Sequence, residues 1–374
     1  MKMMKKIIAL ALVSLMALSF AACHEKDEIA VKVGDLEFTS AYYMCALINA
    51  DMDAQGKAQE SLTDKEKKDP KFDIYSKKID GMDYVEWVEK QAIENIKRNA
   101  AYKMLCAKNK VEPTAEQSAS AKQYAEFYWA NYGYAGLFEP NGVSKNTFVK
   151  YMTDTNCSSL YFDHLYAKEG VKAISDEEMK KTMAENFVLA DSISTSFTDD
   201  QGKPMTDDKI KELKDKFNGY VTALKDGSKT YETVYHEFNG TKESDDTKEE
   251  DKKDENNKED KEELKPINRH ARVLGSKDTA YSSDDFDKVK GMAVNEVKLV
   301  ELEKNGGLTI FVKRDLEADP YYVDQIDSAV RHFLKDDEFK KEIDDFVKGL
   351  KVEVVERAVK PFKVKKIEYP QTGY

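Results

Sequence analysis

A long amphipathic helix predicted near the C-terminus restricts the possible folds of this chain more than any other feature. It follows Asp319-Pro320, and apolar residues recur along one face of it: Val323, Ile326, Val330, Phe333, Ile343, Phe346 and Leu350. A lone helix with such a face needs another element to bury it. The natural partner is a helix-rich module at the other end of the chain, so we expect the intervening segments to form an inserted unit.

The first part of the folded chain, residues 39–186, is predicted to be nearly all helix. A tight hairpin of residues 29–33 and 36–38 precedes it, and Thr39 caps its first helix. Four further helices are marked by apolar periodicity or capping residues and span about 84–109, Thr114 to Trp129, Ser144 to Ala167, and Ser175 to 186. This part is expected to be the helical body of the protein.

Strand patterns replace the helical ones after residue 186. Residues 187–197 alternate and are rich in β-formers, and residues 297–303 and 308–314 form a hairpin around Asn305-Gly306. Shorter elements lie between them: a helix at 207–224, a strand at 271–274 and a helix at 284–292. This composition predicts a small unit in which helices pack on a sheet.

Together these elements predict an α+β fold of two domains. Residues 23–186 and 319–374 form a mostly helical domain that ends in two short strands, near residues 352–355 and 362–367. Residues 187–318 form an α/β domain inserted into it, and the long terminal helix returns to the helical domain.

A strongly acidic stretch interrupts the inserted domain at about residues 240–266. Its centre, Glu243 to Glu263, holds twelve acidic residues and five lysines, a net charge of −7, and no apolar side chain. Such a run cannot bury a core and is expected to be disordered. We favour a solvated insertion loop over a specific role, such as attraction of a cation or a basic client.

The overall charge excludes one class of partner. The chain has 59 Lys and Arg against 71 Asp and Glu, a formal net charge of −12, whereas nucleic-acid phosphates need a basic surface. We therefore expect no nucleic-acid partner. The cysteines and histidines show no spacing typical of a metal site, and no motif predicts a cofactor.

The first residues of the chain are typical of an export signal. Basic residues precede an uncharged apolar run, Ile7 to Phe20, which is too short to cross a bilayer as a mature helix. The following Ala21-Ala22-Cys23 resembles a bacterial lipobox, where a peptidase cleaves before the cysteine and the thiol is acylated. We expect residues 1–22 to be a signal peptide and Cys23 to anchor an extracytoplasmic lipoprotein to the bacterial cell membrane.

Three cysteines remain after this anchor, Cys45, Cys106 and Cys157. Each lies in an apolar, helical context, and none belongs to a C-x-x-C pair. One disulfide can form in an oxidising compartment, but the sequence leaves three pairings open. Buried thiols are the favoured state.

Three features give the chain a resemblance to a known family. They are the lipobox at Cys23, the segment Val31-Lys-Val-Gly-Asp-Leu-Glu-Phe-Thr39, and the α/β unit followed by a returning helix. In this arrangement the chain resembles the PrsA/SurA group of extracytoplasmic foldases over most of its mature length. The resemblance implies a SurA N-like helical chaperone domain and an inserted parvulin-like domain, the peptidyl-prolyl isomerase (rotamase) module of that group.

The resemblance also marks two positions where parvulins carry histidines. The opening strand, usually Ala-Ser-His-Ile-Leu, reads Ala190-Asp-Ser-Ile-Ser194, and the closing strand, usually Gly-Tyr-His-Ile-Ile, reads Gly307-Leu-Thr-Ile-Phe311. Ser192 and Thr309 therefore occupy the histidine positions. A hydrogen bond between them would not restore an imidazole network. We therefore expect weak isomerase activity or none from the candidate catalytic residues Ser192 and Thr309.

Other groups with catalytic potential are sparse. Gly227 followed by Tyr231 is similar to the family's Gly-x-Asp-Phe turn into a helix, whereas its Gly-Gly-Asp-Leu-Gly segment is absent. His236 and His270 flank the acidic insert and are expected to be solvated surface histidines. The chain shows no nucleophile elbow, phosphate-binding glycine loop or H-E-x-x-H motif.

Aromatic residues cluster in the helical part. Phe127, Tyr128, Trp129, Tyr132, Tyr134 and Phe138 fall within twelve positions. Rings and methionines suit the binding of unfolded segments, and they also build cores, which we favour for the clusters as a whole. Tyr128 and Trp129 are adjacent on one helix and cannot both face inward. The client-binding candidates are Tyr42, Tyr43, Met44, Tyr128, Trp129 and Tyr132.

The sequence supports three hypotheses of function, in this order. The first is a membrane-anchored chaperone or foldase that holds unfolded or nascent secreted polypeptides and has a weakly active or inactive parvulin-like domain. The second is an active peptidyl-prolyl cis-trans isomerase of the same fold. The third is a surface lipoprotein that binds a ligand or partner, although the chain lacks the repeated βα units usual in solute-binding lipoproteins. A homodimer is compatible with each.

Overall fold

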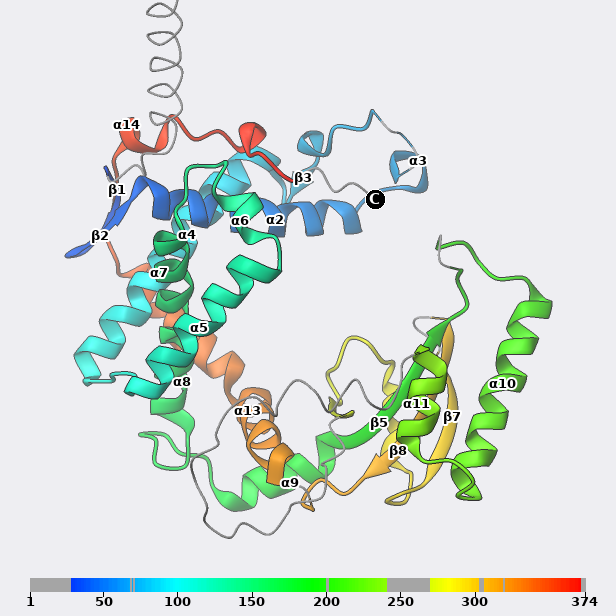
Figure 1. Cartoon of the computed structure of the whole chain (residues 1–374). Coiled ribbons are helices and arrows are strands. Elements are labelled where there is room, and N and C mark those ends of the chain that lie inside the picture. Colours follow the sequence, from blue (N-terminus) through cyan, green and yellow to red (C-terminus); the bar gives the residue numbers. More distant parts are fainter. Residues whose placement is uncertain are drawn as a thin grey trace, which may run out of the picture. The chain divides into compact units, whose positions relative to one another are not determined.

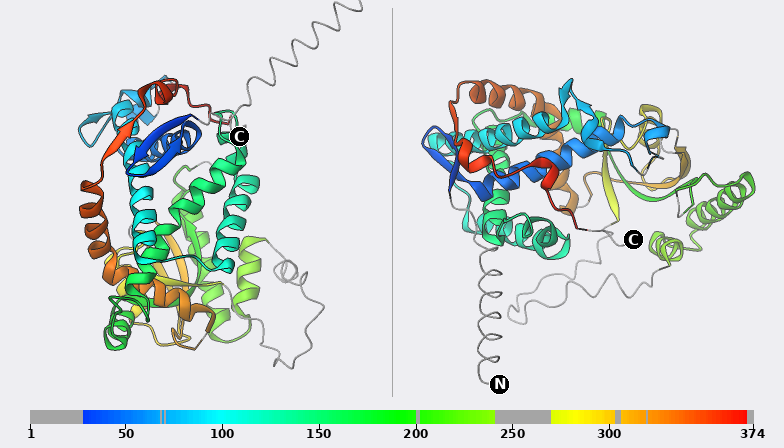
Figure 2. Two further views of the ribbon diagram at one scale, coloured as in Figure 1. Left: turned by 90° about the vertical axis from the view of Figure 1, so that its left-hand side faces the viewer. Right: turned by 90° about the horizontal axis from the view of Figure 1, so that it is seen from above.

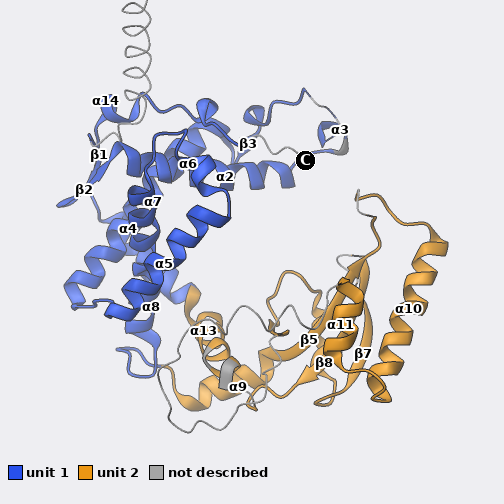
Figure 3. Ribbon diagram, viewed as in Figure 1, with its two compact units in different colours: residues 1–173, 337–374 blue, residues 174–336 orange. Residues whose placement is uncertain are grey.

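The computed structural model describes residues 28–67, 69, 71–199, 202–240, 270–302, 306–318 and 320–370. The predicted signal peptide, the anchor at Cys23 and nearly all of the acidic insert lie outside the described residues. The chain is an α+β protein with small antiparallel sheets. It divides into two compact units: unit 1 holds residues 1–173 and 337–374, and unit 2 holds residues 174–336 (Figure 3).

Unit 2 begins earlier and ends later than the inserted domain expected at residues 187–318. Helix α9 (Asp176–Asn186) runs directly into the first strand of unit 2, and its Met179 and Met183 pack against the core around Phe187. Ile326 of the long helix α13 (Pro320–Lys348) joins the same core. Helix α13 is therefore divided, with residues up to 336 in unit 2 and residues from 337 in unit 1.

The core of unit 1 is built on α2 (Ser40–Glu60) and α4 (Tyr84–Asn109), which pack along each other. The remaining helices of unit 1 are α3 (Asp64–Lys67), η1 (Ile74–Ser76), α5 (Ala115–Asn131), α6 (Tyr134–Phe138), α7 (Lys145–Thr155), α8 (Cys157–Tyr166), α14 (Glu356–Val359) and η2 (Val364–Lys366). Figure 1 shows their order along the chain. The predicted cap at Thr39 is confirmed, because its hydroxyl accepts a hydrogen bond from the Tyr42 amide at 3.3 Å.

Two small sheets complete unit 1. The predicted hairpin is confirmed as β1 (Ile29–Val33) and β2 (Leu36–Thr39), and the C-terminal strand β9 (Val352–Val354) pairs with β1 to give the order β2-β1-β9. The C-terminal segment consequently lies beside the N-terminal hairpin in both views of Figure 2. Two short antiparallel strands of two residues each precede α4. They are β3 (Lys78–Ile79) and β4 (Met82–Asp83), and neither was predicted from the sequence.

Two predicted elements of unit 1 differ from the structure. The helix expected from Ser144 to Ala167 is two helices, α7 and α8, because the hydroxyls of Thr153 and Thr155 bond to backbone carbonyls near the junction and compete with the helical ladder. The strand expected at 362–367 contains the 3₁₀ turn η2 instead. Buried Val364 and Ile367 are three residues apart, a spacing that suits such a turn.

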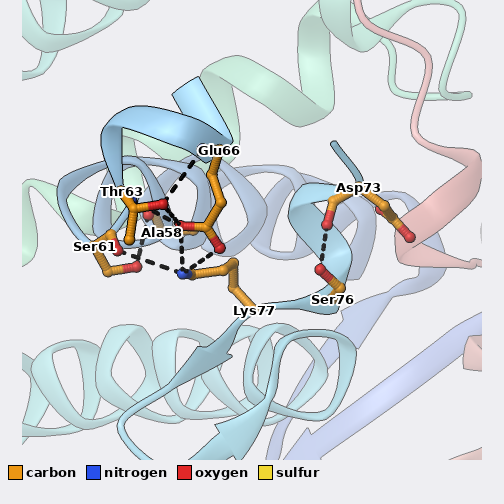
Figure 4. A network of polar contacts seen from close by, with 7 residues as sticks. All are labelled: Ala58, Ser61, Thr63, Glu66, Asp73, Ser76 and Lys77. Atoms are coloured by element: carbon orange, nitrogen blue, oxygen red, sulfur yellow. Dashed lines mark hydrogen bonds and ion pairs between the residues drawn. The ribbon is translucent and has the colours of Figure 1, made fainter. Parts of the chain in front are cut away.

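A polar network holds the segment between α2 and α4 (Figure 4). The carboxylate of Glu66 accepts hydrogen bonds from the amide of Thr63 at 2.7 Å and from its hydroxyl at 2.8 Å. Lys77 Nζ lies 3.3 Å from the same carboxylate and 3.4 Å from the carbonyl of Ser61. These bonds lower the pKa of Glu66, with the Thr63 amide as the largest cause, so the carboxylate stays charged and fastens α3 to the end of α2.

Unit 2 contains one four-stranded antiparallel sheet. Its strands are β5 (Phe187–Ser196), β6 (Ala271–Gly275), β7 (Val297–Leu302) and β8 (Gly307–Arg314), in the order β6-β5-β8-β7. The strand expected at 187–197 and the hairpin expected at 297–314 share one sheet, a pairing that the sequence left open. Helices α10 (Asp207–Lys225), α11 (Tyr231–Asn239) and α12 (Ser283–Lys290) accompany it.

Helices cover both faces of this sheet. On one face, Ala190 and Phe311 pack with Phe286 of α12. On the other face, Ile193 and Ile310 pack with residues of α10 and α11, which lie against the sheet in Figure 1. Because alternate residues of a strand point to opposite faces, the serines of β5 share the face of Ala190.

Candidate functional sites

The first candidate site is the pair of positions where parvulins carry histidines. The register of β5 and β8 places Ser194 opposite Thr309, and Ser192 opposite Phe311. The Ser194 and Thr309 hydroxyls lie 2.9 Å apart and share a hydrogen bond. The partner of Thr309 is therefore Ser194, two residues beyond Ser192 on the same face, and not Ser192, the partner considered from the sequence.

Burial limits what the hydroxyl pair can do. Thr309 is completely buried, and its hydroxyl is engaged with Ser194, which is the exposed member of the pair. An aliphatic hydroxyl does not ionise near neutral pH, so the pair offers one hydrogen bond to a substrate and no acid or base. Strands β5 and β8, all of whose residues are described, contain no histidine.

Ser192 contributes through its backbone. The phenol of Tyr231 donates a hydrogen bond to the Ser192 carbonyl at 2.9 Å, while the serine side chain is half-buried. Burial raises the pKa of Tyr231 well above its usual range, so the ring remains a neutral donor. This bond ties α11 to β5, which makes it a structural contact.

Both histidines near the insert are associated with α11: His236 lies within this helix, and His270 contacts its Tyr235. His270 packs against the ring of Tyr235 with centroids 4.1 Å apart, and His236 meets that ring edge-on at 5.8 Å. His236 is buried, so its expected position on the solvated surface was wrong. The reason is that α11 packs on the sheet and Tyr235 covers the His236 ring.

The second candidate site is the set of aromatic client-binding residues in unit 1. Tyr42, Tyr43 and Met44 are at most 4% exposed, and Trp129 is 7% exposed. These four residues belong to the core and do not form a binding surface. The first three are buried together because α2 lies among β1, β2, α4 and α7, which cover it on several sides.

Helix α5 and its C-cap residue Tyr132 nevertheless present aromatic rings to solvent. Tyr124, Phe127 and Tyr132 are 55%, 50% and 62% exposed, and Tyr128 lies half-buried among them. We call these four residues the α5 aromatic face. Tyr128 and Tyr132 were candidates from the sequence, whereas Tyr124 and Phe127 were not. The spacing of 124, 127, 128 and 132 places all four on one side of a helix, which is the signal that could have identified them.

The rings of the α5 aromatic face hold one another in place. Tyr128 stacks on Tyr132 with centroids 4.7 Å apart, and Phe127 meets Tyr132 at 5.7 Å. Tyr124 lies 4.5 Å from Tyr128, and their hydroxyls are 2.8 Å apart. Such contacts restrict the rings before any ligand binds, which lowers the entropy lost on binding.

The α5 aromatic face is continuous with the core. Tyr128 lies 5.8 Å from the ring of Tyr134, which in turn contacts Phe148 at 5.4 Å, and Phe148 contacts the buried Trp129 at 5.3 Å. At the start of the helix, Thr114 and Gln117 form the predicted capping box. The exposed rings therefore stand on a helix that is capped at one end and packed through Trp129.

Comparisons with known proteins give limited similarity. No protein-family model matches the chain, and no curated protein matches it. The foldase protein PrsA from Streptococcus pneumoniae has 14% identity and a TM-score of 0.35, over 69% of this chain and 83% of that chain. The foldase protein PrsA from Lactococcus lactis has 12% identity and a TM-score of 0.35, over 88% and 96%.

A third solved structure has a similar identity and a lower TM-score. The peptidylprolyl isomerase PrsA from Bacillus cereus has 13% identity and a TM-score of 0.23, over 74% of this chain and 89% of that chain. A likeness of this extent carries no argument about function. In the described part of the chain, no helix combines the length and apolar character needed to span a membrane.

Proposed function

We propose that this protein is an extracytoplasmic chaperone that binds unfolded segments of secreted polypeptides through the α5 aromatic face. The observation that carries the proposal is the exposure of Tyr124, Phe127 and Tyr132 on one side of α5. Exposed rings do not improve the solubility of a chain in which 35% of residues are charged, so solubility does not explain this cluster. Exposed apolar patches of this kind are typical of interaction sites.

The chemistry of the α5 aromatic face suits clients of varied sequence. Unfolded chains expose apolar side chains and unpaired backbone groups together. Tyrosine rings bury apolar surface and keep a hydroxyl for hydrogen bonding, so three tyrosines and one phenylalanine contact both kinds of group. Because no deep pocket is required, the surface tolerates different client segments.

The second part of the proposal concerns location. The lipobox at Cys23 supports export and anchoring, and two acyl chains give stable attachment where one gives only marginal attachment. An anchored chaperone stays close to chains that emerge from the membrane, which raises its effective concentration for them.

The test of client binding is the suppression of aggregation. A chemically unfolded, aggregation-prone client is diluted into buffer with increasing amounts of the purified protein, and light scattering is recorded. We expect scattering to fall in proportion to the protein added, without any nucleotide. Scattering that is unchanged at a molar excess of the protein would remove the proposal.

The competing function is prolyl isomerisation. It is favoured by the position of the Ser194–Thr309 hydroxyl pair and not by the chemistry of the pair, because Thr309 stands where parvulins carry a histidine. We expect catalytic amounts of the protein to change the rate of a proline-limited refolding phase by less than about twofold, because that phase crosses a barrier of ~20 kcal/mol and the buried Thr309 offers no accessible stabilising group. A known prolyl isomerase serves as the positive control.

The outcome that would favour isomerisation is specific to one face of the sheet. It is a larger acceleration that disappears in Thr309→Val and persists in Thr195→Val. Thr195 is the matched control, since it lies on β5, which pairs with β8, and faces the opposite side of the sheet from Thr309.

A further inference from the structure

Two of the three cysteines of unit 1 lie together. Cys106 is in the last turn of α4, and Cys157 is the first residue of α8. The Cys106 thiol donates a hydrogen bond to the Cys157 carbonyl at 3.6 Å, and the two side chains also interact with each other. Cys45 is elsewhere, fully buried on α2 in the core that contains Tyr151.

A second contact holds the same two segments in register. Lys103 lies one helical turn before Cys106, and Asp154 lies three residues before Cys157. Lys103 Nζ donates to the Asp154 carboxylate at 2.8 Å. In each pair the two residues are 51 positions apart in the sequence. The ion pair and the cysteine pair are therefore successive contacts between the same two segments.

The two thiols differ in accessibility. Cys106 is buried, and burial raises its pKa to about 11. Cys157 is half-buried, and burial also raises its pKa, although Lys103 opposes that rise. An external reagent therefore reaches Cys157 first, and Cys106 is placed to attack the sulfur of Cys157 from inside the protein.

We propose that Cys106 and Cys157 are a redox pair that closes to a disulfide by exchange with a small disulfide such as oxidised glutathione. The Cys157 thiolate attacks one sulfur of the donor, which forms a mixed disulfide and releases one thiolate. The Cys106 thiolate then attacks Cys157, forms the Cys106–Cys157 bond and releases the second thiolate. The two protein thiols are oxidised, the donor is reduced by two electrons, and two protons pass to the released thiolates or to water.

The bond would join α4 to α8 across a long loop. Constraining a loop of this size lowers the entropy of the unfolded chain, so the oxidised form of unit 1 is expected to be the more stable one. The oxidation rate should rise with pH, because the thiolate is the attacking species and both thiols are largely protonated near neutrality. That the bond forms in the cell rests on the proposed export; its formation in vitro does not.

The experiment uses the purified full chain carrying Cys23→Ser, in which the remaining thiols are Cys45, Cys106 and Cys157. The reduced protein is equilibrated with mixtures of reduced and oxidised glutathione, alkylated and digested without reduction. Mass spectrometry identifies linked peptides, and thermal unfolding is followed before and after oxidation. We expect one intramolecular link, Cys106 to Cys157, and a rise of the unfolding midpoint by roughly 5–15 °C.

The variants check the order of the two steps. Cys106→Ala should accumulate a glutathione adduct on Cys157, whereas Cys157→Ala should leave Cys106 unmodified. A link that includes Cys45, the absence of any link in strongly oxidising mixtures, or an unchanged midpoint after linkage would overturn the proposal. Peptide mapping of the parent protein does not depend on the folding of the variants. These readouts are independent of client binding, so the failure of either proposal is distinguishable from that of the other.

Discussion

Replacing Tyr124, Phe127 and Tyr132 together by serine is expected to weaken the suppression of client aggregation by about tenfold or more. Each ring in contact with an aromatic client side chain contributes about 0.5–1.5 kcal/mol beyond the area that it buries, and about 1.4 kcal/mol corresponds to a factor of ten in affinity. Tyr128 is retained in this variant, because it is half-buried and contacts Tyr134 of the core.

The matched control removes exposed apolar side chains elsewhere. Met52, Val171 and Val294 are 39%, 69% and 50% exposed and lie outside α5. Their triple replacement by serine is expected to leave suppression unchanged. Circular dichroism and thermal unfolding of both variants show that folding is retained. Equal losses of activity in the two variants would mean that general surface hydrophobicity, and not the α5 aromatic face, binds the client.

Replacing Cys23 by alanine is expected to abolish the membrane attachment of the processed protein. Each buried methylene of an acyl chain contributes about 0.8 kcal/mol to membrane attachment, so the loss of two chains removes far more than any surface contact supplies. In a bacterium that processes lipoproteins, the parent protein should sediment with membranes, and Cys23→Ala should be found in soluble extracytoplasmic fractions or retained as an uncleaved precursor.

A nearby change provides the control for this prediction. Ser19→Ala alters the same signal segment and keeps the acylated residue, so it should leave the protein in the membrane fraction. Mass spectrometry of the N-terminal peptide identifies the lipid directly. A Cys23→Ala protein that is processed and still sediments with membranes would show that another feature attaches it.

The order of elements could be predicted from the sequence because caps and periodicity are local. The bounds of α4, the capping box of Thr114 and Gln117, and the hairpin β1–β2 depend on residues a few positions apart. The sharing of one sheet by β5 and the β7–β8 hairpin remained open from the sequence, because it joins segments that are distant in the chain and both β5 and β8 are buried along most of their length.

The register within that sheet could not be predicted in the same way. Pairing Thr309 with Ser192 or with Ser194 differs by two residues, and a shift of two leaves every side chain on the same face. Hydrophobic alternation therefore cannot distinguish these two registers. Packing of Phe311 with Phe286 of α12 accompanies the observed register, and such a contact exists only in the folded unit.

The burial and exposure of the aromatic residues could be predicted in part from the sequence. The unbroken apolar run of Tyr42 to Ile48 is typical of a helix covered on all sides, so the burial of Tyr42 and Tyr43 had a signal in the sequence. On α5, Ala125 and Trp129 form the inward stripe, and the remaining rings must then face outward. Which ring of the pair Tyr128 and Trp129 is inward depends on contacts with Phe148 and could not be read locally.

The central claim is that the α5 aromatic face, and not the sheet of unit 2, contacts the unfolded client. The direct measurement places the photo-crosslinking residue p-benzoylphenylalanine at Phe127, Tyr132, Val171 or Ser194, one position at a time, and irradiates each protein with an unfolded client. We predict strong crosslinks from positions 127 and 132 and weak ones from position 171, which is the most exposed of these three, and from position 194 on β5. Crosslinks that are strongest at position 194, or equal at all four positions, would contradict the account.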